Sequence, residues 1–263
     1  MRHEVKDIID LDAFPIADPE FGHVSKQTLD SDGVLVLPGF IRDAAVEKIR
    51  AEGAEIMPQA FYTKNEHNVY LAPTDDNLPE NHCRNRKVVS TKGCVTTDQI
   101  PEASLLHTLY KSSQFRQFLC SVLDETELYE YADQLSSINM HYAGEGQELG
   151  WHFDNSSFAI TLLIQKPDSG GEFQYVKDVR DADAGDMNFA ATESIINGEV
   201  TNQSLSMDAG TLVLFRGRNS IHRVTPVEGE TTRMLVVLAY NSEPGIALSE
   251  SASRTFYGRY LPH

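Results

Sequence analysis

Residues 151–165 read Trp-His-Phe-Asp-Asn-Ser-Ser-Phe-Ala-Ile-Thr-Leu-Leu-Ile-Gln. In an extended chain, His152 and Asp154 share one face, and Trp151 and Phe153 share the other. An imidazole and a carboxylate on one face can chelate a single metal ion. The following run, 158–164, is apolar except for one threonine, which is typical of a strand in a buried core rather than of a surface turn. The segment therefore predicts a metal-binding pair where a β-core begins.

The pair alone is weak evidence, because 9 histidines and 39 acidic residues make such a spacing common by chance. A second histidine, His222, lies in another β-like stretch, between Ile221 and Val224. Two histidines and one carboxylate form the triad that leaves positions open on Fe(II), as oxygen chemistry requires. Taken in isolation, however, His222 is more often a hydrogen-bonded core histidine than a ligand.

Arg233 opens the apolar run Arg-Met-Leu-Val-Val-Leu-Ala-Tyr that ends at residue 240. A guanidinium at the mouth of a buried strand is costly unless it meets an anion. Its planar fork matches a carboxylate with two parallel hydrogen bonds. The sequence thus predicts an anion at Arg233, either a ligand or one of the chain's own acidic side chains.

The two halves of the chain differ in pattern. The second half has short β-rich runs separated by Gly, Pro, Asn and Asp, at 136–142, 159–165, 172–176, 211–215 and 233–240. This spacing is typical of an antiparallel sandwich or barrel. The first half has one apolar run at 33–38, helical periodicity from residue 46 to 56 and at 103–123, and a polar stretch at 61–93. So long a polar stretch is often a lid or a binding loop.

We therefore expect one α+β domain over residues 1–263. In this division helical support covers 1–135, the β-core covers 136–245, and a C-terminal extension covers 246–263. A net charge of −17 disfavours nucleic acid and anionic membrane surfaces as partners. The three cysteines, and an N-terminus without an apolar signal segment, fit a cytoplasmic protein. A homodimer stays open.

Together these positions resemble the core of a known enzyme family. The matching residues are Tyr142, Gly144, Gly146, His152, Asp154, Gly170–Phe173, Gly210–Phe215, His222, Val224, Pro226 and Arg233. In this order they resemble the double-stranded β-helix (jelly-roll or cupin-like) core of the Fe(II)/2-oxoglutarate-dependent dioxygenases, especially their prolyl-hydroxylase-like branch. The apolar run at 33–38 and the helix after it also look like the N-terminal entry of that branch.

The resemblance implies a role for each matching residue. His152, Asp154 and His222 would hold Fe(II), and O2 would be the second cosubstrate. Arg233 would bind the C5 carboxylate of 2-oxoglutarate, and Tyr142 would contact the same molecule. Thr161 would replace a tyrosine that several relatives place in this strand as a further cosubstrate contact.

A closer resemblance concerns the substrate. Segments 151–155, 158–165 and 169–175 look like those of bacterial hydroxylases and halogenases that act on free amino acids such as lysine. Halogenating members carry glycine at the carboxylate ligand, so Asp154 implies hydroxylation of an unactivated C–H bond, with release of succinate and CO2. Where that group has a histidine for the substrate carboxylate, this chain has Leu149. The candidate substrate contacts are Arg84, Arg86, Asn155 and Asn241.

Two other functions stay open from the sequence. The enzyme could hydroxylate a protein side chain, as prolyl hydroxylases do, which requires an open groove. The chain could instead be a non-catalytic cupin-like barrel that binds a metal or a sugar, which Arg233 at this offset disfavours. Sequence alone does not separate hydroxylation from carbonyl-forming or ring-forming oxidation on the same iron.

Overall fold

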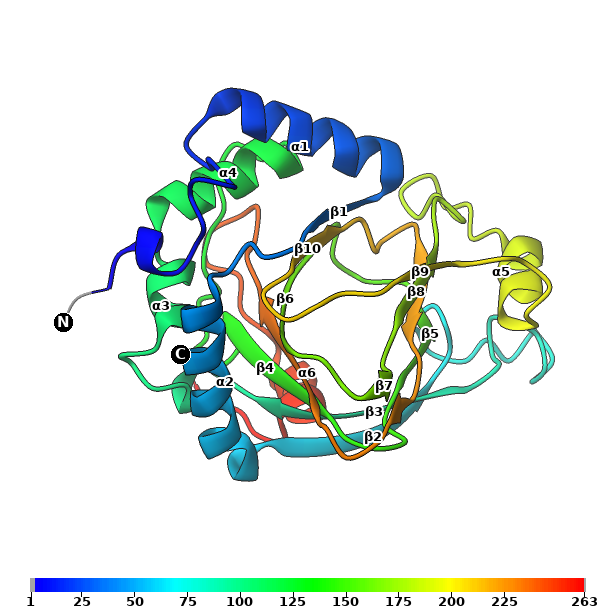
Figure 1. Cartoon of the computed structure of the whole chain (residues 1–263). Coiled ribbons are helices and arrows are strands. Elements are labelled where there is room, and N and C mark those ends of the chain that lie inside the picture. Colours follow the sequence, from blue (N-terminus) through cyan, green and yellow to red (C-terminus); the bar gives the residue numbers. More distant parts are fainter. Residues whose placement is uncertain (1–2, 263) are drawn as a thin grey trace.

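The computed structural model describes residues 3–262, and its helices are concentrated in the first half of the chain (Figure 1). The α-helices are α1 (Pro19–Asp32), α2 (Asp43–Ile56), α3 (Leu105–Tyr110), α4 (Ser113–Leu123), α5 (Phe189–Ile196) and α6 (Glu250–Tyr257). Short 3-10 helices cover Val5–Asp7, Met57–Gln59 and Thr97–Gln99. The strands are β1 (Val34–Leu37), β2 (Phe61–His67), β3 (Val88–Val95), β4 (Ile138–Ala143), β5 (Leu149–His152), β6 (Ala159–Gln165), β7 (Ser169–Gly170), β8 (Phe173–Val176), β9 (Gln203–Leu205), β10 (Leu212–Phe215), β11 (Ile221–Val224), β12 (Val227–Glu228) and β13 (Arg233–Leu238).

The strands form one large antiparallel sheet in the order β1-β10-β6-β13-β4-β3-β5-β11-β8-β9, with β2 paired to β3 and a separate β7–β12 pair. The sheet curls strongly, so that β8 faces β1 and β10 across the interior (Figure 1). An apolar cluster closes this gap, with Val34 from β1, Phe215 from β10 and Tyr175 from β8. The result is the predicted α+β jelly-roll with supporting helices.

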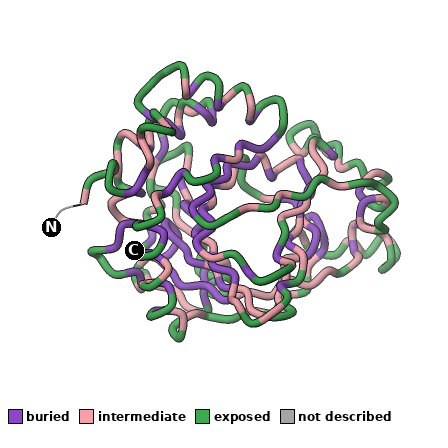
Figure 2. Tube along the Cα trace, viewed as in Figure 1, coloured by how far each residue is buried: buried purple, intermediate pink, exposed green. Residues whose placement is uncertain are grey.

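The sheet separates two environments because side chains alternate along each strand. On β4, the side chains of Ile138, Met140 and Tyr142 join the core beneath α1–α4. The intervening residue His141 lines the cavity inside the curl. Figure 2 shows the buried chain concentrated between the helices and the sheet, with exposed positions along the outer side of α1. The helices therefore stiffen the outer face and leave the inner face free for a site.

Three expectations about local structure were wrong. The polar stretch 61–93 is not one loop, because β2 and β3 pair over seven residue pairs and extend the sheet. Their alternation was hidden by polar side chains at the sheet edge. The helix predicted at 103–123 is two helices, because the Ser112 side chain caps α4 and ends the first one. Finally β5 ends at His152, so Asp154 lies just beyond the strand.

The remaining loop, residues 68–87, packs against α5. Tyr70 stacks on Phe153 and donates a hydrogen bond to the Met187 carbonyl. Trp151 and Phe153 belong to the same apolar cluster, on the side of β5 opposite His152, as the alternation predicted. Across residues 3–262, no helix is both long and apolar enough to span a bilayer.

Candidate metal centre and its cavity

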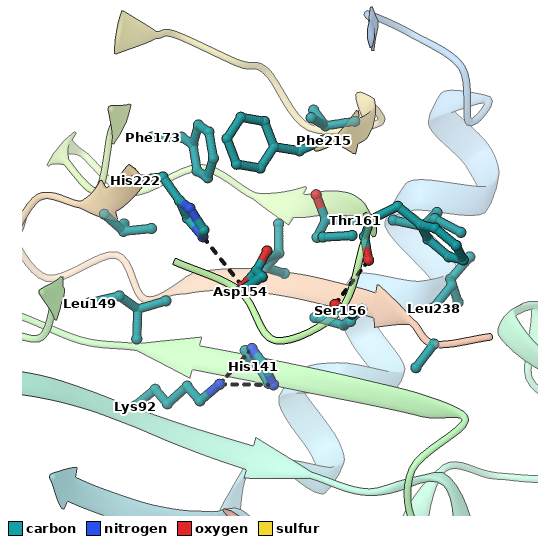
Figure 3. Close-up of a pocket in the computed structure, with 18 of the residues that line it drawn as sticks. Lys92, His141, Leu149, Asp154, Ser156, Thr161, Phe173, Phe215, His222 and Leu238 are labelled. Carbon is teal, nitrogen blue, oxygen red and sulfur yellow. Dashed lines mark hydrogen bonds and ion pairs between the residues drawn. The ribbon is translucent and has the colours of Figure 1, made fainter. Parts of the chain in front are cut away.

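Two histidines and one aspartate, His152, His222 and Asp154, converge inside the curl. Figure 3 labels His222 and Asp154 of this group. His152 on β5 and His222 on β11 are directly paired across the antiparallel ladder, with ring centroids 4.2 Å apart. The Asp154 Oδ1 atom lies 3.8 Å from His152 Nε2 and 3.5 Å from His222 Nε2. One donor atom from each residue lies within 4.8 Å of the others. The predicted triad is therefore assembled in space.

Both imidazoles are held in the tautomer that a metal ligand needs. His152 Nδ1 donates to the Gly150 carbonyl over 2.8 Å, and His222 Nδ1 to the Ser220 carbonyl over 3.1 Å. Because a carbonyl oxygen can only accept, each Nδ1 carries the proton and each Nε2 presents a lone pair to the triad. This second hydrogen bond is typical of metal-ligating histidines.

The charge state of the triad also suits a cation. Burial by itself raises the pKa of Asp154, but His222 and His152 outweigh it and hold the pKa below 3.8. Burial, followed by the neighbouring His222, lowers the pKa of His152 below 6.5. Asp154 Oδ2 is buried and has no hydrogen-bond partner among residues 3–262. A carboxylate with an unsatisfied buried oxygen is costly, and its other oxygen, Oδ1, faces both Nε2 atoms, so this side chain is suited to a metal ion.

The triad opens on a cavity of ≈ 280 Å³. Its walls are largely apolar, with Leu149, Phe158, Val213, Leu235 and Val237 among the lining residues. Asp154 is the only acidic side chain among the described residues that line it. Such a shape, apolar with a few convergent polar groups, is typical of a small-molecule site.

Arg233 begins β13 and reaches into the same cavity. Its side chain is buried, and no hydrogen bond or ion pair joins the guanidinium to any residue between 3 and 262. Burial lowers the pKa of Arg233 to about 10, which leaves it charged at neutral pH. No acidic side chain of the described residues pairs with Arg233, so its guanidinium faces the cavity without a counterion. The anion predicted from the sequence is therefore a ligand rather than one of these acids.

Sequence reasoning missed several further polar groups in the cavity, among them Lys92 and His141 (Figure 3). They come from neighbouring strands, and Lys92 Nζ lies 3.3 Å from both His141 Nδ1 and Nε2. Burial, then the charges of Lys92 and Arg233, lowers the pKa of His141 well below 6.5. Burial also lowers the pKa of Lys92. The signal in the sequence is that Lys92 shares one strand face with Ser90 and Cys94. This pattern can be recognised only once β3 is known to be a strand.

Two predicted cosubstrate contacts have different outcomes. Thr161 lines the cavity beside Val213 and Val237. The prediction for Tyr142 is wrong, because its side chain lies on the outer face of β4 and donates a hydrogen bond of 2.8 Å to the Gly53 carbonyl in α2. The spacing to His152 matched the family pattern, but the inward residue of this strand is His141.

The four predicted substrate contacts all lie outside the cavity lining. Arg86 bonds the C-terminal end of α5, through the Asn197 side chain and the Ile196 carbonyl. The backbone amide of Arg84 bonds His82, in the same loop. Asn155 is exposed, and the backbone of Asn241 pairs with Tyr129. The structure does not bring these four residues to the cavity lining, and their substrate roles stay predictions.

Comparisons with known proteins agree with this fold. The family model described as Halogenase D matches residues 18–255. Among solved structures, the non-heme alpha ketoglutarate dependent carbocyclase SnoK from nogalamycin biosynthesis aligns at TM-score 0.60 and 12% identity, covering 91% of this chain and 93% of its own. The epimerase SnoN from the same biosynthesis aligns at TM-score 0.59 and 11% identity, covering 85% and 81%.

A 2OG-Fe(II) oxygenase family protein from Burkholderia pseudomallei aligns at TM-score 0.55 and 12% identity, covering 86% of this chain and 92% of its own. These likenesses establish the fold. No curated protein sequence matches the chain.

Proposed function

This chain belongs to the Halogenase D family, and we propose that it is an Fe(II)- and 2-oxoglutarate-dependent hydroxylase of an amino acid or amino-acid-like small molecule. The observation that carries the proposal is the combination of the assembled triad and the buried, unpaired Arg233 in one cavity. A binding barrel needs a metal site, but it does not need a buried cation aimed at a second ligand beside that site.

The residues present fit the metal and the cosubstrate. His152, Asp154 and His222 would hold Fe(II), and Oδ1 of Asp154, which faces both Nε2 atoms, would be the carboxylate ligand. Arg233 would bind the far carboxylate of 2-oxoglutarate and lose its unpaired state. Thr161, which lines the cavity from β6, would contact the same ligand. Bound together, iron, 2-oxoglutarate and O2 supply the oxidation of a C–H bond, with release of succinate and CO2.

The chain's own residues orient the reactants and exclude water. Phe173 and Phe215 pack against the His222 ring, with centroids 5.4 and 4.9 Å from it, and close one side of the triad. The opposite side of His152 is backed by the cluster of Trp151 and Phe153. These rings fix the ligand orientation, which is the protein's main contribution to such chemistry.

Asp154 supports hydroxylation rather than halogenation. In the resembling halogenases a glycine at this position leaves room for chloride, whereas here a carboxylate fills the space. A cavity of ≈ 280 Å³ suits a small molecule better than a folded protein segment.

The test is succinate formation by the Fe(II)-loaded protein with 2-oxoglutarate and O2, across a panel of free and N-modified amino acids. Asp154→Ala is the matched control. We expect one panel member to stimulate succinate formation in the wild-type protein but not in the variant. Confirmed iron binding without succinate above the variant's level would refute the proposal.

A further inference from the structure

Lys92 is a second cation inside the cavity that the proposed chemistry does not use. It lies on β3, is half-buried, and lines the space that the triad faces (Figure 3). Its ammonium makes no ion pair with any residue between 3 and 262. The polar group beside it is the His141 ring, with the ammonium 3.3 Å from both ring nitrogens. A buried ammonium without an anion is costly, so the position calls for a ligand.

The contact with His141 leaves most of the ammonium's hydrogen-bonding capacity unused. An ammonium equally distant from both ring nitrogens lies on the plane midway between them, so it does not align with the lone pair of either nitrogen. An ammonium carries three donors, and this contact occupies at most one of them. The imidazole instead fixes where the ammonium lies, with Arg233 on the same inner face two strands away from Lys92.

The charges of the filled site leave Lys92 without a counterion. The two charges of Fe(II) are offset by the two carboxylates of 2-oxoglutarate, and Asp154 offsets Arg233. The remaining cation is Lys92, and no other acidic side chain among the described residues lines the cavity. One further anion would neutralise the site, and the substrate is the only reactant left to supply it.

We propose that the ammonium of Lys92, positioned by His141, binds a carboxylate of the substrate, and that this substrate carries no free ammonium beside that carboxylate. The inference rests on the proposed function and narrows its substrate class to acids such as N-acyl amino acids. An α-ammonium would lie within a few ångströms of Lys92 and face the same cationic site without an acidic partner. Apolar walls at Leu149, Leu235 and Val237 suit the remainder of such a molecule.

The experiment is calorimetric titration of the anaerobic Fe(II)–2-oxoglutarate protein. The probes are N-acetyl-L-leucine and N-acetyl-L-methionine, their primary amides, and free L-leucine and L-methionine. We expect at least one N-acetyl acid to bind about tenfold or more tightly than its amide, as loss of a charge-assisted hydrogen bond predicts. The same acid should bind more tightly than the free amino acid. Equal affinity for acid and amide, or tighter binding of the free amino acid, would overturn the inference.

Lys92→Met provides the second arm, with the exposed neighbour Lys64→Met on β2 as control. Lys92→Met should abolish the preference for acid over amide and leave the affinity for 2-oxoglutarate within about twofold, whereas Lys64→Met should change neither. Loss of 2-oxoglutarate binding in Lys92→Met would assign the lysine to the cosubstrate and overturn the inference. Failure of the proposed function would look different, because the wild-type protein would then not bind 2-oxoglutarate at all.

Discussion

The carboxylate of Asp154 occupies the space that a side chain at Gly217 would need. The Asp154 amide donates to the Gly217 carbonyl over 3.0 Å, and a Cβ built on Gly217 would collide with Asp154 Oδ2. Asp154 lies beyond the end of β5, so strand pairing does not orient it. The loop after β10 therefore acts as the support that positions the carboxylate ligand.

Gly217→Ala should weaken metal binding without unfolding the protein. The added methyl must displace the Asp154 carboxylate, and disturbing the support of a metal ligand typically costs about 10–100-fold in affinity. Calorimetric titration with Fe(II) under anaerobic conditions measures this. The control is Gly144→Ala, because a Cβ there would meet nothing closer than the end of the Gln147 side chain at 3.8 Å. Equal affinity in the two variants would show that Gly217 does not position Asp154.

Arg233→Met should stabilise the ligand-free protein and destroy cosubstrate binding. Removing a buried charge that has no partner should raise the free energy of unfolding, by about 1–4 kcal/mol if it behaves like other buried charges replaced by apolar groups. Losing the guanidinium should cost about 2–5 kcal/mol of binding free energy for 2-oxoglutarate.

Denaturant unfolding and calorimetry give the two values for Arg233→Met. Arg223→Met is the contrasting variant, because Arg223 lies over the Trp151 ring at 4.8 Å and bonds Gln174 over 2.8 Å. That variant should be destabilised and should keep 2-oxoglutarate binding. A destabilised Arg233→Met protein would mean that the guanidinium is paired in solution.

His141 should make the metal-free protein less stable in mild acid. Burial, together with Lys92 and Arg233, lowers the folded-state pKa of His141 well below 6.5. Below pH 6.5 the His141 imidazole takes up a proton in the unfolded chain but stays neutral in the folded chain. The free energy of unfolding therefore falls as the pH falls.

In His141→Gln this contribution should vanish, and the pH dependence of the unfolding free energy below pH 6.5 should become shallower by up to about 1.4 kcal/mol per pH unit. Urea unfolding at closely spaced pH values measures the slope. The other titrating groups are shared by both proteins and cancel in the difference. An unchanged slope would contradict the buried, neutral state of His141.

Tyr142→Phe tests the face of β4 directly. Because the Tyr142 hydroxyl bonds the Gly53 carbonyl and points away from the cavity, the variant should bind 2-oxoglutarate as the wild-type protein does. It should lose about 0.5–1.5 kcal/mol of stability through one buried hydrogen bond. Calorimetry with 2-oxoglutarate and a denaturation curve check both expectations. A large loss of cosubstrate affinity would restore Tyr142 to the binding site.

Features with a local signature could be predicted from the sequence. Strand β6 was located because five of its seven residues are apolar. The alternation around His152 and the β-like surroundings of His222 made the triad a candidate, and the family resemblance implied the metal roles. Arg233 was identified as a cation that needs an anion, because a charge that begins a buried apolar strand is costly unless an anion pairs with it.

Other features depended on pairings between distant segments. The role of Lys92 required β3 to pair with β4, which placed the ammonium beside His141, 49 residues away. The inward residue of β4 could not be chosen from spacing alone, since a shift of one position reverses every side chain of a strand. This is why Tyr142 was assigned in place of His141.

The sequence by itself determined the chemistry that the site can hold, because ligand types and strand alternation are local properties of the chain. Only the tertiary structure decided which cations share the cavity and what supports Asp154. It also decided that Arg86 bonds the C-terminal end of α5. The physical reason is that contact between residues far apart in sequence depends on sheet register and curl. Those are set by the packing of the whole core rather than by any single segment.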